Sequence, residues 1–298
     1  MTRAMLEATD VVPVQKKKEK VYLVTLKRLL KNKLAVAGLV IICLQIAMAV
    51  FAPLIVTHEP AKQVLSASEL PMFSEGHWLG TDNYGRDVWS RIVYGARISL
   101  IVGITAVSLG LVGGITLGLL GGYYKKMDGI IMRVVDLLFS FPGILLAMLI
   151  IAILGTSLVN VAIAISIWSI PSCARIVRGS VLSIKQKEYI MAMKSLGASD
   201  LRIMVRHILP NATAPIIVFA TMRMGTAILS TASLSYLGLG AQPPTPEWGA
   251  MISQGQSFMW TSPHLTIVPG IAIMLTVFAF NVLGDGLRDA LDPNMDIQ

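Results

Sequence analysis

Long apolar segments alternate with shorter polar ones along most of this 298-residue chain. About 20 consecutive apolar residues are needed for a helix to cross the hydrocarbon core of a bilayer. One charge-free stretch, residues 137–174, is too long for a single crossing, and Gly155, Thr156 and Ser157 divide it into the two arms of a tight hairpin. The pattern therefore predicts an all-α membrane protein with six transmembrane helices, at residues 34–56, 98–122, 134–154, 158–175, 212–239 and 265–284.

Composition agrees with this class. Hydrophobic residues make up 54% of the chain, charged residues only 14%, and the mean hydropathy is +0.69. Soluble domains carry roughly a quarter charged residues. The net charge of +8 does not indicate a nucleic-acid partner, because aromatic residues do not interleave with the basic clusters.

The positive charges predict the orientation. With the N-terminus inside, 20 of the 25 Lys and Arg residues lie on the inner side, four lie outside, and Arg223 falls within a span. Both termini are therefore expected in the cytoplasm, as tails of residues 1–33 and 286–298. The cluster Lys16, Lys17, Lys18 and Lys20 suits topology and contact with anionic lipid. No apolar core follows Met1, so the first span is expected to act as the targeting signal.

The outer segment, residues 57–97, contains the turn-forming sequence TDNYGRD at 81–87. Val88, Ile92 and Ile98, together with Trp89 and Tyr94, then form an amphipathic stretch. We expect this stretch to be a separate interfacial helix lying along the membrane surface.

The polar segment at residues 188–211 predicts a small helix–elbow–helix unit on the cytoplasmic side. Tyr189, Met193 and Leu196 share one face of a short helix, which Gly197 ends. Ser199 and Asp200 begin a second helix, which Pro210 closes before the next span. The spacing alone fits an ordinary loop as well as a surface gripped by a partner.

Residues for catalysis are not evident. The sequence lacks the G-x-x-x-x-G-K-[ST] loop that holds ATP phosphates. Its four histidines, at 58, 77, 207 and 264, show no metal-ligand spacing, and Cys43 and Cys173 lie in different apolar segments. We therefore predict no catalytic residue, no metal site and no cofactor in this chain.

Arg223 is the one clear charge inside a predicted span. It could line a translocation path and meet a substrate carboxylate, or it could hold a neighbouring helix. A proton- or ion-coupled secondary transporter usually carries acidic or histidine relays at the midplane, which are not evident here. The energy for transport is therefore expected from outside the chain, and a secondary transporter remains the alternative from a different class.

Four separated stretches carry a family resemblance. Residues 188–211 match the coupling loop of ABC-importer permeases, which begins Glu-Ala-Ala, although Met193 replaces the second alanine. The other stretches are HWLGTDNYGRDVWSRIVYGARISL at 77–100, YLGLGAQPPTPEWGAMI at 236–252 and FNVLGDGLRDALDP at 280–293. Over residues 27–293 the chain resembles the second permease subunit of the dipeptide, oligopeptide, glutathione and nickel import group.

The resemblance implies the type I ABC importer permease fold, with a permease core at residues 98–285, in the bacterial plasma (inner) membrane. It implies a second homologous permease, two ABC ATPase subunits that carry ATP and Mg²⁺, and an extracytoplasmic substrate-binding protein. The chain itself is then a transport subunit and not an enzyme. Coupling to the ATPases is expected through Glu188, Tyr189, Ala192, Met193, Leu196, Gly197, Ala198, Ile208, Leu209 and Pro210.

The substrate expected from the resemblance is a di- or oligopeptide or glutathione. IKQKEYI, HILPN, TMRMGTAI and AQPPTPEWGAMI are more similar to the glutathione and dipeptide branch than to the oligopeptide branch. Nickel or a metal chelate is the alternative within the same group.

Overall fold

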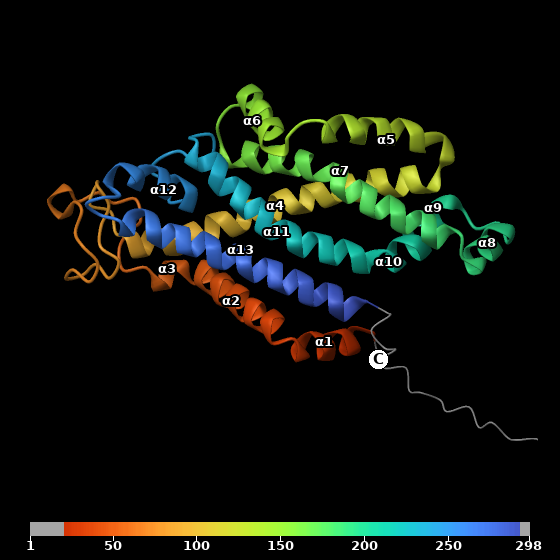
Figure 1. Cartoon of the computed structure of the whole chain (residues 1–298), viewed down its shortest axis with the longest axis horizontal. Coiled ribbons are helices and arrows are strands. Elements are labelled where there is room, and N and C mark those ends of the chain that lie inside the picture. Colours follow the sequence, from red (N-terminus) through yellow and green to blue (C-terminus); the bar gives the residue numbers. More distant parts are fainter. Residues whose placement is uncertain (1–20, 293–298) are drawn as a thin grey trace, which may run out of the picture.

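The computed structural model describes residues 21–292, and side chains from residue 24 onward. The basic cluster at residues 16–20 and the last six residues of the predicted C-terminal tail lie outside this range. The described part is helical and contains no β-strand (Figure 1). The elements are α1 Val21–Lys31, α2 Lys33–Val50, α3 Ala52–Ile55, η1 Leu65–Ala67, α4 Val88–Tyr123, α5 Lys125–Phe139, α6 Gly143–Leu154, α7 Leu158–Lys185, α8 Glu188–Ser195, α9 Asp200–Ile203, η2 Met204–Ile208, α10 Leu209–Asn211, α11 Thr213–Tyr236, α12 Trp248–Gly255, η3 Gln256–Phe258 and α13 His264–Leu291.

Five of the described helices, α2, α4, α7, α11 and α13, are long and apolar enough to cross a membrane. The remaining predicted span, at residues 134–154, is divided between α5 and α6, which meet at an angle of 90°. Pro142 lies at the break, and a proline lacks the N–H that a helix interior needs. The 12 residues of α6 rise only about 18 Å, which is too short for a full crossing. The single straight helix expected at residues 134–154 is therefore not what forms.

The hairpin after α6 forms as the sequence predicts. Gly155 has a φ of +90°, a conformation that glycine adopts without a steric penalty. Ser157 then caps α7, and its hydroxyl accepts a hydrogen bond from the Asn160 N–H at 3.1 Å.

The expected separate interfacial helix does not form. Residues 88–98 are the first turns of α4, which runs without interruption for 36 residues. Asp87 caps this helix through the Ser90 N–H, and Val88 and Ile92 are buried in the core. Gly95 lies inside this helix, and because it has no side chain the Trp248 indole packs against the backbone there. The indole Nε1–H donates to the Ile92 carbonyl at 3.1 Å.

A stripe of glycines brings α4 close to α7. Gly110, Gly114, Gly118 and Gly122 recur every four residues, so they lie on one face of α4. A Cβ on Gly114 would lie 2.3 Å from the Cys173 Cβ, far inside contact distance. Small residues permit this approach of two helices in a membrane, where packing drives association. The two helices therefore form a closely packed pair at the centre of the bundle.

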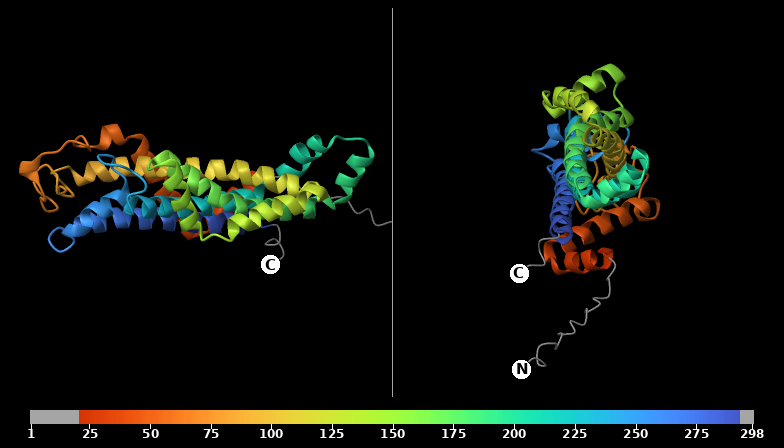
Figure 2. Two further views of the ribbon diagram at one scale, coloured as in Figure 1. Left: turned by 90° about the horizontal axis from the view of Figure 1, so that it is seen from above. Right: turned by 90° about the vertical axis from the view of Figure 1, so that its right-hand side faces the viewer.

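The long helices run side by side along the longest axis of the molecule (Figure 1). At one end, residues 188–211 form a segment that we call the hook. Its helices α8 and α9 extend beyond the bundle, as Figure 2 shows from above. The loops between α3 and α4 gather with α12 at the opposite end (Figure 1). Near the hook end, α1 lies beside the end of α13, and the Arg28 Nη1 donates to the Asp292 carbonyl at 3.3 Å.

Candidate functional site

The hook, residues 188–211, contains the helix–elbow–helix unit predicted from the sequence. Gly197 ends α8 with a φ of +81°, in the left-handed region that L-residues adopt at a cost. The Ala198 N–H donates to the Met193 carbonyl at 3.1 Å, which closes the C-terminus of the helix. Ser199 occupies the N-cap position of α9, but its side chain makes no capping hydrogen bond. Backbone geometry at Gly197 thus sets the angle between the two helices.

The inner face of the hook packs against the ends of the long helices. Ile190, Ile203 and Ile208 are buried in a cluster with Val177 and Val181 of α7. A π-helical turn at Met204–Ile208 changes the helical register within this stretch. Ile208, one of the predicted coupling residues, therefore packs inside the chain and presents no surface to a partner.

One side-chain hydrogen bond joins the hook to α4, and two others hold the chain on either side of it. The Tyr123 hydroxyl, at the end of α4, donates to the Asp200 carboxylate at 2.6 Å. Lys185 Nζ, at the end of α7, donates to the Tyr123 carbonyl. At the base of the hook the Asn211 amide donates to the His207 carbonyl at 2.6 Å. The hook is therefore held against the ends of α4 and α7.

The outer face of the hook exposes several apolar side chains. Leu196, at the elbow, is 86% exposed, and Tyr189 is also exposed, whereas Met193 is partly buried. The sequence reading missed three exposed apolar side chains, Met191, Leu201 and Val205. Leu201 and Val205 are four residues apart, and this i, i+4 spacing was a signal that could have indicated them. The other predicted coupling residues are distributed as follows: Glu188, Ala192, Gly197 and Pro210 are exposed, and Ala198 and Leu209 are partly buried.

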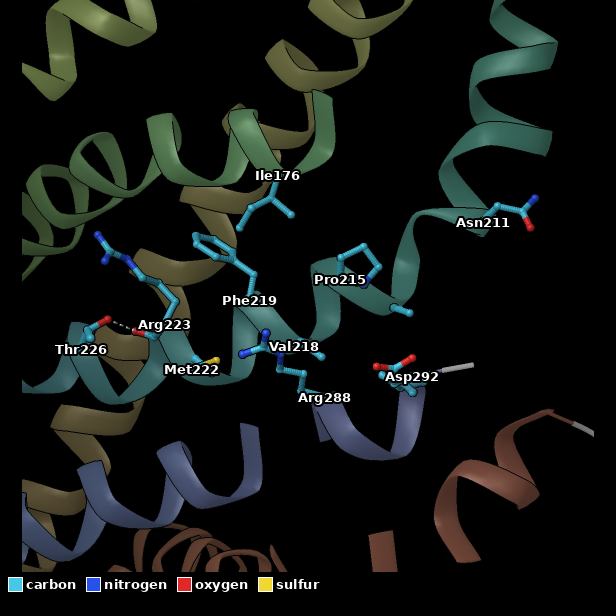
Figure 3. Close-up of a pocket in the computed structure, with 12 residues that line it drawn as sticks. Ile176, Asn211, Pro215, Val218, Phe219, Met222, Arg223, Thr226, Arg288 and Asp292 are labelled. Atoms are coloured by element: carbon cyan, nitrogen blue, oxygen red, sulfur yellow. Dashed lines mark hydrogen bonds between the residues drawn. The ribbon is translucent and has the colours of Figure 1, made fainter. Parts of the chain in front are cut away.

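A cavity of about 690 Å³ lies between α7, α11 and the end of α13. Figure 3 shows Arg223 and Phe219 extending from α11, with Ile176 above them on α7. Arg288 reaches into the same cavity from α13 (Figure 3). Two arginines on different helices thus face one mainly apolar space.

The Arg223 guanidinium carbon lies 4.7 Å from the centre of the Trp168 ring on α7, which is a cation–π contact. Its Nε and Nη2 atoms are buried and have no hydrogen-bond partner among the described residues. Arg223 therefore contacts a neighbouring helix, and two of its donors have no partner among the described residues.

At the end of the bundle opposite the hook, the TDNYGRD sequence at residues 81–87 forms a hydrogen-bonded network with neighbouring segments. The Asp82 Oδ1 accepts the N–H groups of Tyr84 and Arg86, at 2.9 and 3.0 Å, so the predicted turn is present. Arg86 Nε donates to Asp82 Oδ2 at 2.6 Å, and its Nη2 reaches Gln254 of α12 at 2.8 Å. Arg91 Nη1 donates to the carbonyls of Pro60 and Pro244. These contacts join the loop after α3 to the start of α4 and to α12.

A bundle of apolar helices with a hook at one end defines a multi-pass membrane protein of the permease class. Residues 114–297 match the binding-protein-dependent transport system inner membrane component family, and residues 24–71 match the N-terminal transmembrane domain of oligopeptide transport permease C. The chain belongs to this binding-protein-dependent transport family.

The relatives and structural neighbours of the chain are also ABC transport proteins. The dipeptide transport system permease protein DppC of Alkalihalophilus pseudofirmus is 52% identical over 270 residues, covering 90% of this chain and 88% of the relative. The glutathione transport system permease protein GsiD of Pectobacterium atrosepticum is 51% identical over 271 residues, covering 90% of each. A chain of the inward-facing methionine ABC transporter MetNI superposes with a TM-score of 0.57 at 20% identity, over 69% of this chain and 98% of that one.

The chain is therefore a permease subunit of an ABC importer with the type I fold in the inner membrane, as the resemblance implies. In this family separate ATPase subunits carry out ATP hydrolysis, so the chain is not an enzyme. Family membership also excludes the ion-coupled secondary transporter. Nickel transport is not favoured by these relatives.

Proposed function

We propose that this permease imports short peptides or glutathione and forms one half of the translocation path. A second homologous permease would form the other half, an extracytoplasmic binding protein would deliver the substrate, and two ATPases would bind ATP and Mg²⁺. The names of its relatives, a dipeptide and a glutathione permease, support the substrate class. Arg223 and Arg288 in one cavity support it chemically, because guanidinium groups suit the carboxylates of such substrates.

The hook is the proposed contact with the ATPases. The observation that carries this proposal is an exposed apolar outer face on a segment that is held firmly on its inner side. Closure of the ATPases on ATP would move the hook, and α4 and α7 would transmit the movement through the bundle. The cavity would then open alternately to the two sides of the membrane.

Replacing Leu196 by Asp tests this contact. Leu196 makes little contact within the chain, so the fold should survive, whereas burial of a carboxylate in an apolar groove is costly. We expect Leu196→Asp to reduce co-purification of the ATPases and to abolish uptake. Leu65→Asp is the matched control, because Leu65 is also exposed and lies at the opposite end. Normal assembly and uptake in Leu196→Asp would refute the coupling role of the hook.

The proposed orientation places both termini and the hook in the cytoplasm. Ser68 and Ser199 are exposed at opposite ends of the bundle, so each can be replaced by Cys in a chain in which Cys43 and Cys173 are replaced by Ala. An impermeant thiol reagent added to intact cells should label Ser68→Cys. It should label Ser199→Cys only after permeabilisation. Labelling of Ser199→Cys in intact cells would reverse the orientation.

A further inference from the structure

Three segments meet at the beginning of α4, at the end of the molecule opposite the hook (orange loops in Figure 1). Asp87 is the N-cap residue of α4, His77 lies in a turn ten residues earlier, and His58 follows α3. The side chains of these three residues converge, and one ligand atom of each lies within 4.8 Å of the others. This cluster is remote from the hook and from the cavity beside Arg223.

The Asp87 carboxylate is buried and held in place by hydrogen bonds. The Asp87 side chain is 1% exposed, and its Oδ2 accepts the Ser90 N–H at 2.8 Å and the Ser90 hydroxyl at 2.7 Å. The Thr57 hydroxyl lies 3.4 Å from the same oxygen. Oδ1 is left to face the two imidazoles. A helix cap thus holds one carboxylate oxygen in a defined position.

The two histidines approach this oxygen from the same side. His77 Nδ1 lies 2.8 Å from Asp87 Oδ1, and His58 Nδ1 lies 4.0 Å from it. The two rings are stacked, with centroids 4.5 Å apart and planes inclined by 25°. His77 is mostly buried, whereas the His58 side chain is 40% exposed. The cluster is therefore built from two constrained groups and one that solvent can reach.

We propose that His58, His77 and Asp87 form a binding site for a divalent transition-metal ion of the Zn²⁺ type. Two imidazole nitrogens and one carboxylate oxygen are a donor set that suits Zn²⁺ and related ions. Mg²⁺ and Ca²⁺ prefer oxygen ligands throughout. The exposed side at His58 leaves room for water to complete the coordination shell.

Most of the movement falls to His58. Ligand atoms that share one Zn²⁺ at about 2.0–2.1 Å lie roughly 3–4 Å apart. The His77 Nδ1 and Asp87 Oδ1 atoms, at 2.8 Å, therefore have to separate slightly, whereas the widest spacing in the cluster, up to 4.8 Å, has to close. The ring of His58 must also turn. The two imidazole rings are stacked, so the lone pairs on their nitrogens, which lie in the ring planes, do not converge on one ion. Its Nδ1 contacts only the Thr57 hydroxyl at 3.0 Å besides the cluster, while its backbone N–H is held by Ser90 Oγ at 3.1 Å. The backbone is therefore in place and the side chain is free to turn.

A bound ion would join the chain after α3, the turn at His77 and the start of α4. Because it binds the folded protein, it would also stabilise the fold. The sequence could not reveal this site, because positions 58, 77 and 87 follow no ligand spacing and meet only through the turns between them.

Zinc binding to the assembled transporter tests the proposal. The complex, purified through a tag without histidines and treated with chelator, is titrated with Zn²⁺ alone. His58→Ala and His77→Ala should each weaken binding to the permease site by about 100-fold or more, beyond the 10–100-fold typical of losing an outer-shell partner. His58→Cys should restore it, because Cys supplies another ligand. His207→Ala, which changes a histidine in the hook, should bind Zn²⁺ as the wild type does.

His58→Ala is the decisive variant, because an exposed side chain can be removed without unfolding the protein. A Zn²⁺ isotherm shared by His58→Ala and the wild type would overturn the proposal, as would the absence of stoichiometric binding to the wild type. The midpoint of thermal unfolding gives a second measurement. It should rise with Zn²⁺ in the wild type and in His58→Cys and stay unchanged in His58→Ala. Neither measurement involves uptake, so either can fail while the proposed transport function stands.

Discussion

Tyr123 and Asp200 are joined by a hydrogen bond of 2.6 Å between a hydroxyl and a carboxylate, although 77 residues separate them in the sequence. The bond connects the last residue of α4 to the first residue of α9 in the hook. Because α4 packs along α7, this bond connects the hook to a pair of helices that are in contact along the bundle. If the hook moves, this bond would pull on the end of α4.

Tyr123→Phe removes this bond and keeps the ring. A hydrogen bond to a charged group contributes about 1.5–3 kcal/mol, so the docked position of the hook should become roughly tenfold or more less favoured. We expect less substrate taken up per ATP hydrolysed, with the ATPases still bound. Tyr236→Phe is the matched control, because it removes a tyrosine hydrogen bond to Gln256 at the opposite end. Equal loss of coupling in both variants would contradict the role of the Tyr123–Asp200 bond.

Gly114→Ala should destabilise the packing of α4 on α7. The added Cβ would lie 2.3 Å from the Cys173 Cβ, and overpacking of this kind costs about 1–3 kcal/mol. We expect a lower midpoint of thermal unfolding and a lower yield of the complex. Gly270→Ala is the control, since nothing lies within 4 Å of a Cβ placed there.

A double variant separates packing from other effects. Cys173→Gly removes the side-chain atom that the new methyl group meets, so Gly114→Ala combined with Cys173→Gly should recover part of the lost stability. Additive losses in the double variant would show that the glycine stripe is not what brings the helices together.

Glu247, in the loop before α12, should make the stability of the fold depend on pH. Burial raises the pKa of this carboxyl above its ordinary value of about 4.5, and hydrogen bonds from the backbone of Ala250 and Gly249 offset part of the rise. The folded protein thus holds the proton to a higher pH than the unfolded chain does. The free energy of unfolding should therefore fall as the pH rises from the ordinary carboxyl value through the raised one.

Glu247→Gln keeps the shape of the side chain and cannot ionise. The difference in melting temperature between wild type and Glu247→Gln should change as the pH rises above about 4.5, with the wild type losing stability toward higher pH. Glu75→Gln changes an exposed carboxyl and should follow the wild-type pH profile. A wild-type profile parallel to that of Glu247→Gln would show that Glu247 does not titrate differently in the fold.

The lengths of the charge-free apolar segments were enough to predict five of the six spans and, with Gly155, the hairpin. It could not show the break between α5 and α6, because Phe139 and Phe141 keep this region apolar while Pro142 interrupts the backbone. The charge-free segment placed the start of the second span at residue 98, after Arg97, whereas α4 already begins at Val88. Arg91 lies in this extension in a fully buried position, and its partners are carbonyls of Pro60 and Pro244, which lie far away in the sequence.

The hook could be located from its sequence, but its exposed face could not be assigned in full. The turn at Gly197 could be predicted because its φ of +81° is a conformation that glycine adopts without a steric penalty. Which side of α8 faces outward depends on Ile190, which packs into the cluster with Val177 and Val181 of α7. That contact is tertiary, so Met191 was not recognised as part of the outer surface.

Arg223 carries the last prediction, because its contact with Trp168 and its unpaired donors favour different functions. If the guanidinium binds a substrate carboxylate, Arg223→Gln should slow uptake while the ATPase activity stimulated by the loaded binding protein persists. Arg223→Lys should recover only part of the uptake, because lysine lacks the planar fork that fits a carboxylate. Trp168→Leu should then have a smaller effect, since it leaves the guanidinium in the cavity.

If Arg223 instead holds α11 against α7, its loss should act through stability. A cation–π contact contributes about 0.5–2 kcal/mol, and Trp168→Leu should remove as much of it as Arg223→Gln does. Both variants should then lower the melting temperature, with uptake and ATPase activity falling in proportion. Uptake, ATPase activity and melting temperature measured on one preparation of each variant decide between the two. Equal destabilisation by both variants would remove Arg223 from the substrate path, because a residue that only contacts substrate leaves the stability of the empty transporter unchanged.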